Sequence, residues 1–324
     1  MAILRHWKKI LLVLAVVAVL VATIGLPYAV ARLVTHAGTR PMDRELTSSP
    51  SDYDLDFESV SFTSTDGVTL SGWYLGGADS DVAIACGHGL FRSRREVLDR
   101  AAFFRKQGYD TLVFDFRRHG ESEGEKVTLG FDERFDFLGA VEFLHERQPG
   151  AQVVLYGVSM GAAASLLAAA ETEEVAAVIA DSSFSSLEHT VVHHVDFIFG
   201  LPRFPFGTSL LFFLEMQGGF DRAEFDLERT ITEIGDRPVL IVAGEDDARM
   251  PVAIQRRLYQ RAVNEHSGFR SFPGASHGRA YRTDANGYEA MLTEFLSEAG
   301  LAPSKSKNPE PEEASGEDST LSSP

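Results

Sequence analysis

One serine of the sequence lies in a pattern that is typical of an enzyme nucleophile. Ser159 is the centre of Gly157–Gly161, which reads Gly-Val-Ser-Met-Gly. The apolar run Val153–Tyr156 precedes this pentapeptide and small residues follow it, which predicts a strand-to-helix turn at the serine. Such a turn exposes the hydroxyl, and the two glycines avoid collisions with neighbouring backbone. The pentapeptide alone can arise by chance, but with its strand and helix it predicts that Ser159 attacks a carbonyl carbon.

A serine nucleophile needs a base and a group that orients the base. The candidates for the orienting acid follow the apolar run Val239–Ala243, where Glu245, Asp246 and Asp247 share one short loop. The alternative for these acids is a solvated loop, or a cap for a helix that begins near Pro251.

The candidate base follows the last predicted strand. His277 comes after the run 269–272, and small residues flank it, which leaves its ring free to reach a serine. The chain has 10 histidines, so position and order along the chain single out His277. His266 precedes the same strand and would lie at the wrong edge of the sheet.

Acyl transfer also needs backbone N–H groups that stabilise an oxyanion. The first expected donor is Met160, because it follows the nucleophile at the start of a helix. The second should come from the loop Gly87–Phe91, which follows a predicted strand and contains two glycines. We assign Leu90 N–H to this role, with Phe91 N–H as the alternative, and we expect His88 to brace the loop.

The elements that must position these residues alternate between predicted strands and helices. Two runs around Asp66-Gly67 predict a β-hairpin. Further apolar runs, each followed by a helix-like segment, predict an α/β fold with a mostly parallel sheet covered by helices on both faces. Ligands bind at the carboxyl ends of the strands in such folds. The predicted strands are Phe57–Thr63, Val68–Leu75, Val82–Cys86, Thr111–Phe116, Val153–Tyr156, Val175–Ala180 and Val239–Ala243.

These motifs together resemble the α/β-hydrolase superfamily. Asp115–Ser122 is similar to the family's Asp-x-Arg-Gly-x-Gly-x-Ser loop, although Arg118 stands where a small residue is usual. The segments 128–145 and Ala180–Phe184 are similar to bacterial membrane-anchored, esterase-like serine hydrolases near the dienelactone hydrolase and prolyl-oligopeptidase-like branches. The resemblance covers about residues 55–300.

The resemblance implies the α/β-hydrolase fold and a catalytic triad of Ser159, Asp247 and His277. In relatives the orienting acid usually has the spacing Gly-x-x-Asp-x-x-aliphatic-Pro, which favours Asp247 and leaves Asp246 as the alternative. The fold alone does not identify a substrate.

The N-terminal segment predicts a membrane anchor. Ile10–Ala31 contains no charged residue, and as a helix it would be about 33 Å long, enough to cross a bilayer. Arg5, Lys8 and Lys9 precede it, which favours a single-pass protein of the cell membrane with its body on the outer side. A signal peptide cleaved after Ala29-Val30-Ala31 is the alternative.

The predicted organisation has four parts. An anchor (1–35) and a polar linker (36–55) precede a hydrolase domain (56–301), and a disordered acidic tail (302–324) follows it. An insertion at about 185–237 is expected to form a small helical cap. The cap is rich in phenylalanine, which indicates an apolar substrate pocket, side chains that attach the cap to the body, or a surface that rests against the membrane.

Composition excludes several classes of protein. The net charge of −17 repels phosphate backbones, so we expect no nucleic acid as a partner. The single cysteine, Cys86, rules out an internal disulfide framework and is expected in the core. His189, His193 and His194 in the cap are expected to pack rather than to bind a metal, and we expect no cofactor.

The leading prediction is a membrane-tethered serine hydrolase that cleaves a small-molecule ester or acyl substrate through an acyl-enzyme. A serine peptidase or aminopeptidase-like hydrolase of the prolyl-oligopeptidase branch is the alternative within enzymes. A catalytically silent binding protein on the same fold is the alternative of another class.

Overall fold

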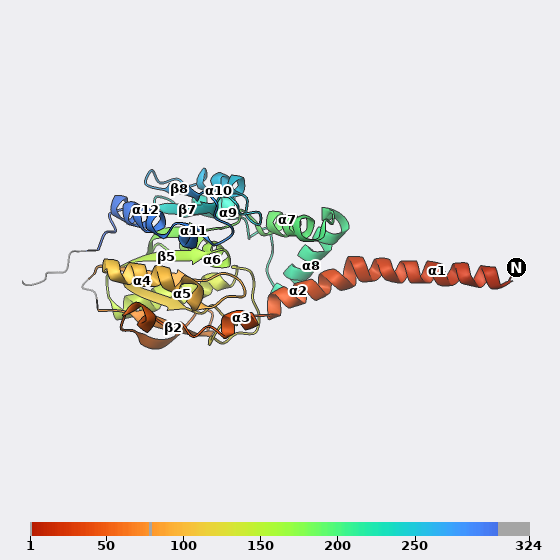
Figure 1. Cartoon of the computed structure of the whole chain (residues 1–324), viewed down its shortest axis with the longest axis horizontal. Helices are drawn as coiled ribbons and strands as arrows, with labels where there is room; N and C mark the ends of the chain where they lie inside the picture. The colour runs from red at the N-terminus through yellow and green to blue at the C-terminus, as the bar shows by residue number, and fades with distance from the viewer. Residues whose placement is uncertain (1, 78–79, 304–324) are drawn as a thin grey trace, which may run out of the picture.

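One eight-stranded sheet forms the centre of the body (Figure 1). The computed structural model describes residues 2–77 and 80–303. The strand order is β1-β2-β4-β3-β5-β6-β7-β8. The strands are β1 Glu58–Thr63, β2 Thr69–Leu75, β3 Val82–Gly87, β4 Asp110–Phe114, β5 Gln152–Val158, β6 Val175–Asp181, β7 Val239–Gly244 and β8 Gly268–Phe272.

The predicted mostly parallel sheet is confirmed. Strand β2 runs antiparallel to both of its neighbours, β1 and β4, and every other pair of neighbours is parallel. The hairpin around Asp66-Gly67 is also confirmed, because β1 and β2 pair from Glu58 opposite Tyr74 to Thr63 opposite Thr69. The parallel register brings the carboxyl ends of β3, β5, β6 and β7 to one edge, where the candidate residues follow them.

Helices cover both faces of the sheet, as the sequence predicts. One face carries α5, α6, α9 and α10, and the other carries α4 and α12. The bounds of the body helices are α4 Leu98–Gln107, α5 Glu133–Arg147, α6 Met160–Glu171, α9 Leu227–Glu233, α10 Val252–Tyr259, α11 Ala280–Thr283 and α12 Ala285–Glu298, with a 3₁₀ turn η3 at Arg94–Val97.

Strand β3 is buried at every position, and its side chains alternate between the two faces of the sheet. Ala83 and Ala85 point into the cluster beneath α5 and α6, whereas Ile84 and Cys86 point into the cluster beneath α4 and α12. Side chains alternate along a strand, so a strand that is covered on both sides is apolar at every position. Cys86 is a core residue, and burial raises the pKa of its thiol.

A long N-terminal helix extends away from the body (Figure 1). Helix α1 (Ala2–Leu20), the π-helical turn η1 (Val21–Gly25) and α2 (Leu26–His36) follow one another without a break. In the described part of the chain this is the one unbroken helix whose length and apolarity would allow it to cross a membrane, a test that a signal sequence also passes. Its far part is exposed, and its near part packs on the protein.

The end of this helix is fixed to the body. Ala31 is buried in the main core cluster, and Val127 N–H donates to the carbonyl of Thr35 at 2.8 Å. Arg118 Nε donates to the carbonyl of His36 at 2.7 Å. Arg118 has φ +63°, a left-handed backbone conformation that favours glycine. The side chain of Arg118 therefore caps the last turn of α2 from a strained backbone position.

The segment after this helix also contacts the body. It contains the short helix α3 (Pro41–Arg44) and the 3₁₀ turn η2 (Pro50–Tyr53), and Thr39, Asp43 and Pro50 are buried. Almost all of the predicted acidic tail, from residue 304 onward, lies outside the described residues.

Two helices of the predicted cap region stand out from the body beside α2 (Figure 1). They are α7 (Leu187–Phe199) and α8 (Thr208–Gly218), joined through the turn η4 (Arg203–Gly207). Helix α8 packs against α2, whereas α9 of the same insertion packs against α6 and α10. We call residues 187–218, which contain α7, η4 and α8, the cap.

Arg117 connects three elements of the fold. Its guanidinium donates to Asp66 in the β1–β2 turn and to Asp136 on α5, at 2.6–3.0 Å. Asp136 is fully buried, and burial raises the pKa of its carboxyl to about 7 against the opposing effect of Arg117. A buried carboxylate is tolerated when a cation and N–H donors satisfy it.

We expect Arg117→Met to lower the free energy of unfolding by about 3–5 kcal/mol, because it leaves the Asp136 carboxylate buried without its cation. The loss should be smaller at pH 5 than at pH 8, since protonated Asp136 needs no cation. Urea unfolding of the purified full chain in detergent measures both. Arg229→Met is the control, because the exposed Arg229–Glu233 pair should contribute less than about 1 kcal/mol. Equal losses in the two variants would contradict this role of Arg117.

Candidate active site

Ser159 lies at a sharp turn between β5 and α6. Its φ of +56° and ψ of −111° are strained for a residue with a side chain, and its N–H donates to the carbonyl of Asp181 at 2.8 Å. A Cβ on Gly157 would lie 2.2 Å from the carbonyl oxygen of Gly161, and a Cβ on Gly161 would lie 2.7 Å from that of Gly87. Both glycines are therefore required by close backbone contacts, as the sequence motif predicts.

The three residues predicted to form a triad lie in one hydrogen-bonded chain. His277 Nε2 is 2.8 Å from Ser159 Oγ, and His277 Nδ1 is 2.8 Å from Asp247 Oδ2. With the Nδ1–H donating to Asp247, Nε2 can accept the hydroxyl proton of Ser159. This is the arrangement that a serine needs to become a nucleophile at neutral pH.

The structure distinguishes the acids of the β7–α10 loop. Asp247 is buried, and its Oδ1 accepts the N–H groups of Arg249 and Met250, each at 2.9 Å. Glu245 and Asp246 are exposed. Two backbone donors hold the carboxylate in place while its other oxygen faces His277, so Asp247 is the acid that geometry brings to the site.

The loop after β3 lies against Ser159, as expected for an oxyanion loop. A Cβ on Gly89 would lie 3.5 Å from Ser159 Cβ. Phe91 N–H donates to His119 Nε2 at 3.2 Å, so the alternative donor is already engaged. In the described part of the chain no hydrogen-bond partner is found for Leu90 N–H. Met160 is the first residue of α6, so its N–H has no carbonyl one turn earlier.

Comparisons with known proteins agree with this architecture. A family model described as serine aminopeptidase, S33, matches residues 78–201. The uncharacterised protein YqkD of Bacillus subtilis is 26% identical over 298 residues, which is 89% of this chain and 97% of the relative. The protein bem46 of Schizosaccharomyces pombe is 24% identical over 300 residues, which is 88% of this chain and 92% of the relative.

Among solved structures, the Pyrococcus furiosus esterase Pf2001 is similar with a TM-score of 0.66 and 26% identity, over 81% of this chain and 98% of that one. The family model and this solved structure support the α/β-hydrolase superfamily as the family of the chain. The predicted fold is thereby confirmed, and a hydrolase is the class of enzyme that these relatives support.

Two buried histidines hold the loop after β3, the candidate oxyanion loop. His88 Nε2 accepts Phe116 N–H at 3.1 Å, and its Nδ1–H donates to the carbonyl of Gly89 at 2.8 Å. His119 accepts from Phe91 and donates to the carbonyl of Arg117 at 2.9 Å. Burial lowers the pKa of His88 well below its usual value and that of His119 to about 4. Both rings are neutral at pH 7, and each connects the loop after β3 to the loop after β4.

Asp181 and Ser182, which the sequence did not single out as site residues, hold both ends of the candidate nucleophile–base pair. Ser182 Oγ accepts the N–H of Gly278, the residue after His277, at 3.0 Å and donates to Asp181 Oδ1 at 2.8 Å. The carbonyl of Asp181 accepts Ser159 N–H. The sequence places them at the carboxyl end of β6, the strand beside β5, and this position could have indicated that they lie near Ser159.

Glu96 is a third residue near the site that the sequence did not indicate. Its Oε2 accepts Gly89 N–H at 2.7 Å, and its Oε1 lies 3.1 Å from Arg92 Nε. Burial raises the pKa of the Glu96 carboxyl. The carboxylate thus lies behind the oxyanion loop, and no sequence motif marks it.

The segment after the N-terminal helix contacts the same loop. Arg40 N–H donates to the carbonyl of Phe91 at 3.0 Å, and Thr39 Oγ1 donates to that of Arg92 at 2.8 Å. The Asp43 carboxylate lies 3.2 Å from Arg92 Nη1. Residues next to the predicted anchor are therefore part of the support of the active-site loop.

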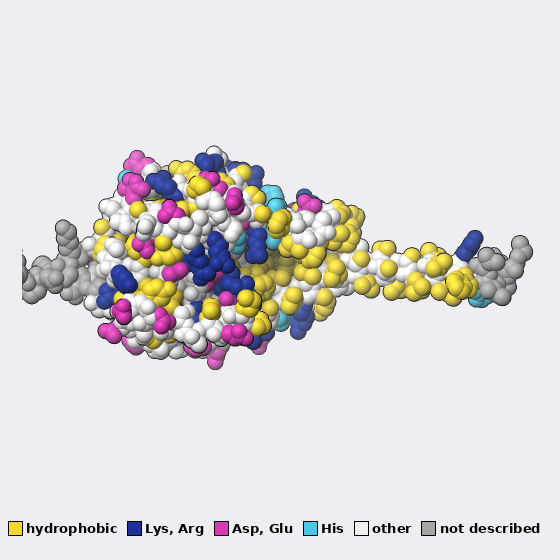
Figure 2. Space-filling model, viewed as in Figure 1, with side chains coloured by type: hydrophobic (Ala, Val, Ile, Leu, Met, Phe, Trp, Pro, Cys, Tyr) yellow, Lys and Arg dark blue, Asp and Glu magenta, His cyan; other side chains and the backbone are white. Residues whose placement is uncertain are grey.

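The cap contacts the loop that carries Asp247. His193 Nε2–H donates to the carbonyl of Ala248, next to Asp247, at 2.8 Å, and its ring stacks on Phe197. His194 Nδ1–H donates to the carbonyl of Thr190 at 2.8 Å. These contacts are the cap packing that the sequence predicts for His193 and His194. In the view of Figure 2, hydrophobic side chains lie between the body and the cap.

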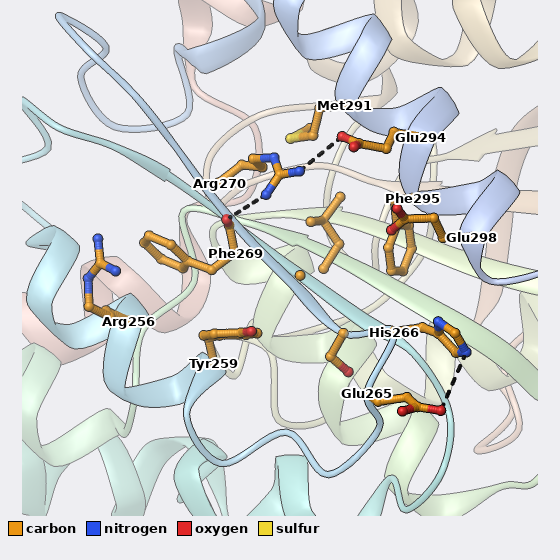
Figure 3. A pocket seen from close by; sticks show the side chains of 13 residues that line it. Arg256, Tyr259, Glu265, His266, Phe269, Arg270, Met291, Glu294, Phe295 and Glu298 are labelled. Atoms are coloured by element: carbon orange, nitrogen blue, oxygen red, sulfur yellow. Dashed lines mark hydrogen bonds and ion pairs between the residues drawn. The ribbon is translucent and has the colours of Figure 1, made fainter.

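One hollow on the body lies away from these residues. A pocket of about 680 Å³ lies beside β8 between α10 and α12, with Leu240 near the amino end of β7 among its lining residues. Figure 3 shows Arg270 turned toward Glu294, which it meets at 2.9 Å, and His266 beside Glu265. Because Ser159 and His277 follow the carboxyl ends of their strands, this pocket is separate from the candidate active site.

We expect Ser182→Ala to slow the reaction of Ser159 with a fluorophosphonate probe by about 10- to 100-fold, because Gly278 N–H loses its acceptor and His277 is no longer held in position. The labelling rate of the purified hydrolase measures this effect. Ser276→Ala is the matched control, since Ser276 is an exposed serine on the other side of His277. Equal labelling rates in the two variants would exclude this positioning role.

Proposed function

We propose that this hydrolase cleaves carboxylic esters through an acyl-enzyme on Ser159. The supporting observation is the chain of two 2.8 Å contacts from Asp247 through His277 to Ser159. The proposed donors to the oxyanion are Leu90 and Met160 N–H, which flank the serine from the β3 loop and from α6.

The proposed mechanism has two steps. His277 takes the proton of Ser159 as its oxygen attacks the ester carbonyl, and Asp247 stabilises the imidazolium that forms. His277 then protonates the leaving alcohol and next activates a water molecule that hydrolyses the acyl-enzyme. Each step uses the same pair of hydrogen bonds, so no further titrating group is required.

Two observations favour ester substrates over peptides. They are the description of a similar structure and the contacts that already occupy the Glu96 carboxylate. The similar Pyrococcus furiosus structure is described as an esterase. Peptidase activity is the second candidate, because the matching family model is described as a serine aminopeptidase. An aminopeptidase needs a carboxylate that binds the substrate ammonium, but the nearby Glu96 carboxylate already accepts Gly89 N–H and pairs with Arg92.

The N-terminal helix is proposed to anchor the hydrolase in the cell membrane, with the body on the outer side. Arg5, Lys8 and Lys9 before the apolar stretch support this orientation. Burial of Ala31 in the body supports an anchor over a signal peptide. Cleavage after Ala31 would remove half of α2 and its packing on α8.

We expect Ser159→Ala to abolish labelling by a fluorophosphonate probe and to reduce ester hydrolysis by at least about 10³-fold, because no other group replaces the nucleophile. A panel of acyl esters of increasing chain length, compared with aminoacyl and peptide amides, measures the specificity of the full chain. Unchanged labelling after Ser159→Ala would refute the mechanism. Faster turnover of amides than of esters would favour the peptidase.

The neighbouring acids provide a matched pair of variants. Asp247→Asn should lower kcat by about 10⁴-fold, because the amide favours the wrong tautomer of His277. Asp246→Asn should retain activity within about twofold, since Asp246 is exposed. Steady-state kinetics of the two variants on one soluble ester measures the difference, and the reverse order would transfer the role to Asp246.

A further inference from the structure

The cap carries an apolar surface that the body does not cover. Residues 197–214, bounded by Asp196 and Glu215, contain one charged residue, Arg203, and Arg203 is paired with Glu188. Five large apolar side chains of this region are half or more exposed, namely Phe197, Ile198, Phe199, Phe204 and Phe212, with Phe204 78% exposed, whereas Leu211 and Leu214 are buried. Single exposed apolar residues are common, but a continuous surface of this kind marks an interaction site.

The cap contacts the N-terminal helix inside its apolar stretch. The turn η4 touches η1 (Val21–Gly25), and Phe213 packs edge-on against Tyr28 with ring centroids 5.4 Å apart. Gln217 lies on the same side, because its Nε2 donates to the carbonyl of Tyr28 at 3.3 Å. The cap and the proposed anchor therefore form one packed unit.

These contacts determine how deep η4 would lie in a bilayer that the N-terminal helix crosses. Val21–Gly25 precedes Ala31, the end of the uncharged stretch, by six to ten residues, which is about 9–15 Å along a helix. If the stretch crosses the bilayer, η4 lies within the half of the hydrocarbon core nearer the body, which is about 15 Å thick. Amphipathic elements at membrane surfaces reach similar depths of about 5–10 Å.

The shape and the surface agree with this depth. Helix α7 and the η4–α8 segment together are apolar enough for a membrane span but meet at an angle of 118°, as in a segment that enters a membrane and returns. Figure 2 shows mostly hydrophobic side chains along α1 and the cap, whereas charged side chains gather on the body. Arg118 and Thr35 fix the helix to the body, so the anchor also sets the position of the cap.

We propose that the tip of the cap, residues 197–214, inserts into the membrane leaflet nearest the body and that the active site takes its ester substrate from this leaflet. The substrate class is then an ester of a long acyl chain that resides in the bilayer. His193 connects α7 to the loop of Asp247, so the inserted helix borders the site directly. The substrate part rests on the proposed esterase function, whereas the insertion does not.

Depth-dependent quenching tests the insertion. Phe204→Cys and Val263→Cys, each in a Cys86→Ala background, are labelled with an environment-sensitive dye, and the full chain is reconstituted in phosphatidylcholine vesicles with brominated acyl chains. Val263 is the matched control, because it is apolar and 59% exposed. It precedes β8, at the amino ends of the parallel strands, whereas the candidate active site lies at their carboxyl ends. We expect strong quenching at position 204 and none at position 263.

Two results would overturn the insertion. One is equal, weak quenching at both positions. The other is an apolar environment at position 204 without quenching but with energy transfer between labelled copies, which would make this surface an interface between two chains.

An activity measurement tests the substrate class. Phe204→Asp should lower the rate on a long-chain ester in vesicles, relative to the rate on a short soluble ester, by roughly tenfold, as expected for removing one phenylalanine from lipid. An unchanged ratio, with Val263→Asp as control, would contradict delivery from the bilayer. If the unmodified chain hydrolyses neither ester, the proposed function fails, and the quenching result still decides the insertion.

Discussion

The strained backbone of Ser159 is the constraint on which the rest of the site depends. A serine with φ +56° can persist only where neighbouring structure holds it. Gly157 and Gly161 make the turn sterically possible, and the hydrogen bond from Ser159 N–H to Asp181 ties it to β6. The turn projects the hydroxyl above the carboxyl edge of the sheet, where loops from β3, β7 and β8 converge.

Buried polar groups hold these loops and the neighbouring loop after β4. His88 and His119 are neutral and each satisfies one backbone donor and one acceptor. Arg117 and Asp136 are paired, and Asp247 is held by two backbone N–H groups. Such groups stabilise one loop conformation because any other would leave a buried donor, acceptor or charge unsatisfied. The position of the Ser159 hydroxyl thus depends on buried groups, all of which except Asp247 have no part in the proposed reaction.

The N-terminal helix has a comparable structural role. Its last turns are part of the core, Arg118 caps its end, and Thr39 and Arg40 contact the oxyanion loop. The same helix packs on the cap, whose other side contacts the loop of Asp247. Direct contacts therefore connect the N-terminal helix, the cap and the candidate active site, and these contacts are the basis for proposing that the site faces the lipid.

The sequence by itself determined the sheet, the hairpin at Asp66-Gly67 and the turn at Ser159, because hydrophobic periodicity and glycine requirements are local. It also singled out His277, which the structure brings to 2.8 Å from Ser159 Oγ, since chain order and strand ends restrict the choice of base. The sequence favoured Asp247 over Asp246 only through the spacing of a family motif, and the tertiary structure adds that Asp247 is buried and contacts His277, because adjacent residues in a loop differ in burial and direction rather than in type. The tertiary structure alone brought Asp181, Ser182, Glu96 and His119 to the site, since their partners are distant in sequence and no local pattern records a hydrogen bond across the sheet. The packing of α2 on α8 could not be predicted from the sequence either, because an apolar helix has the same sequence pattern whether it contacts lipid or protein.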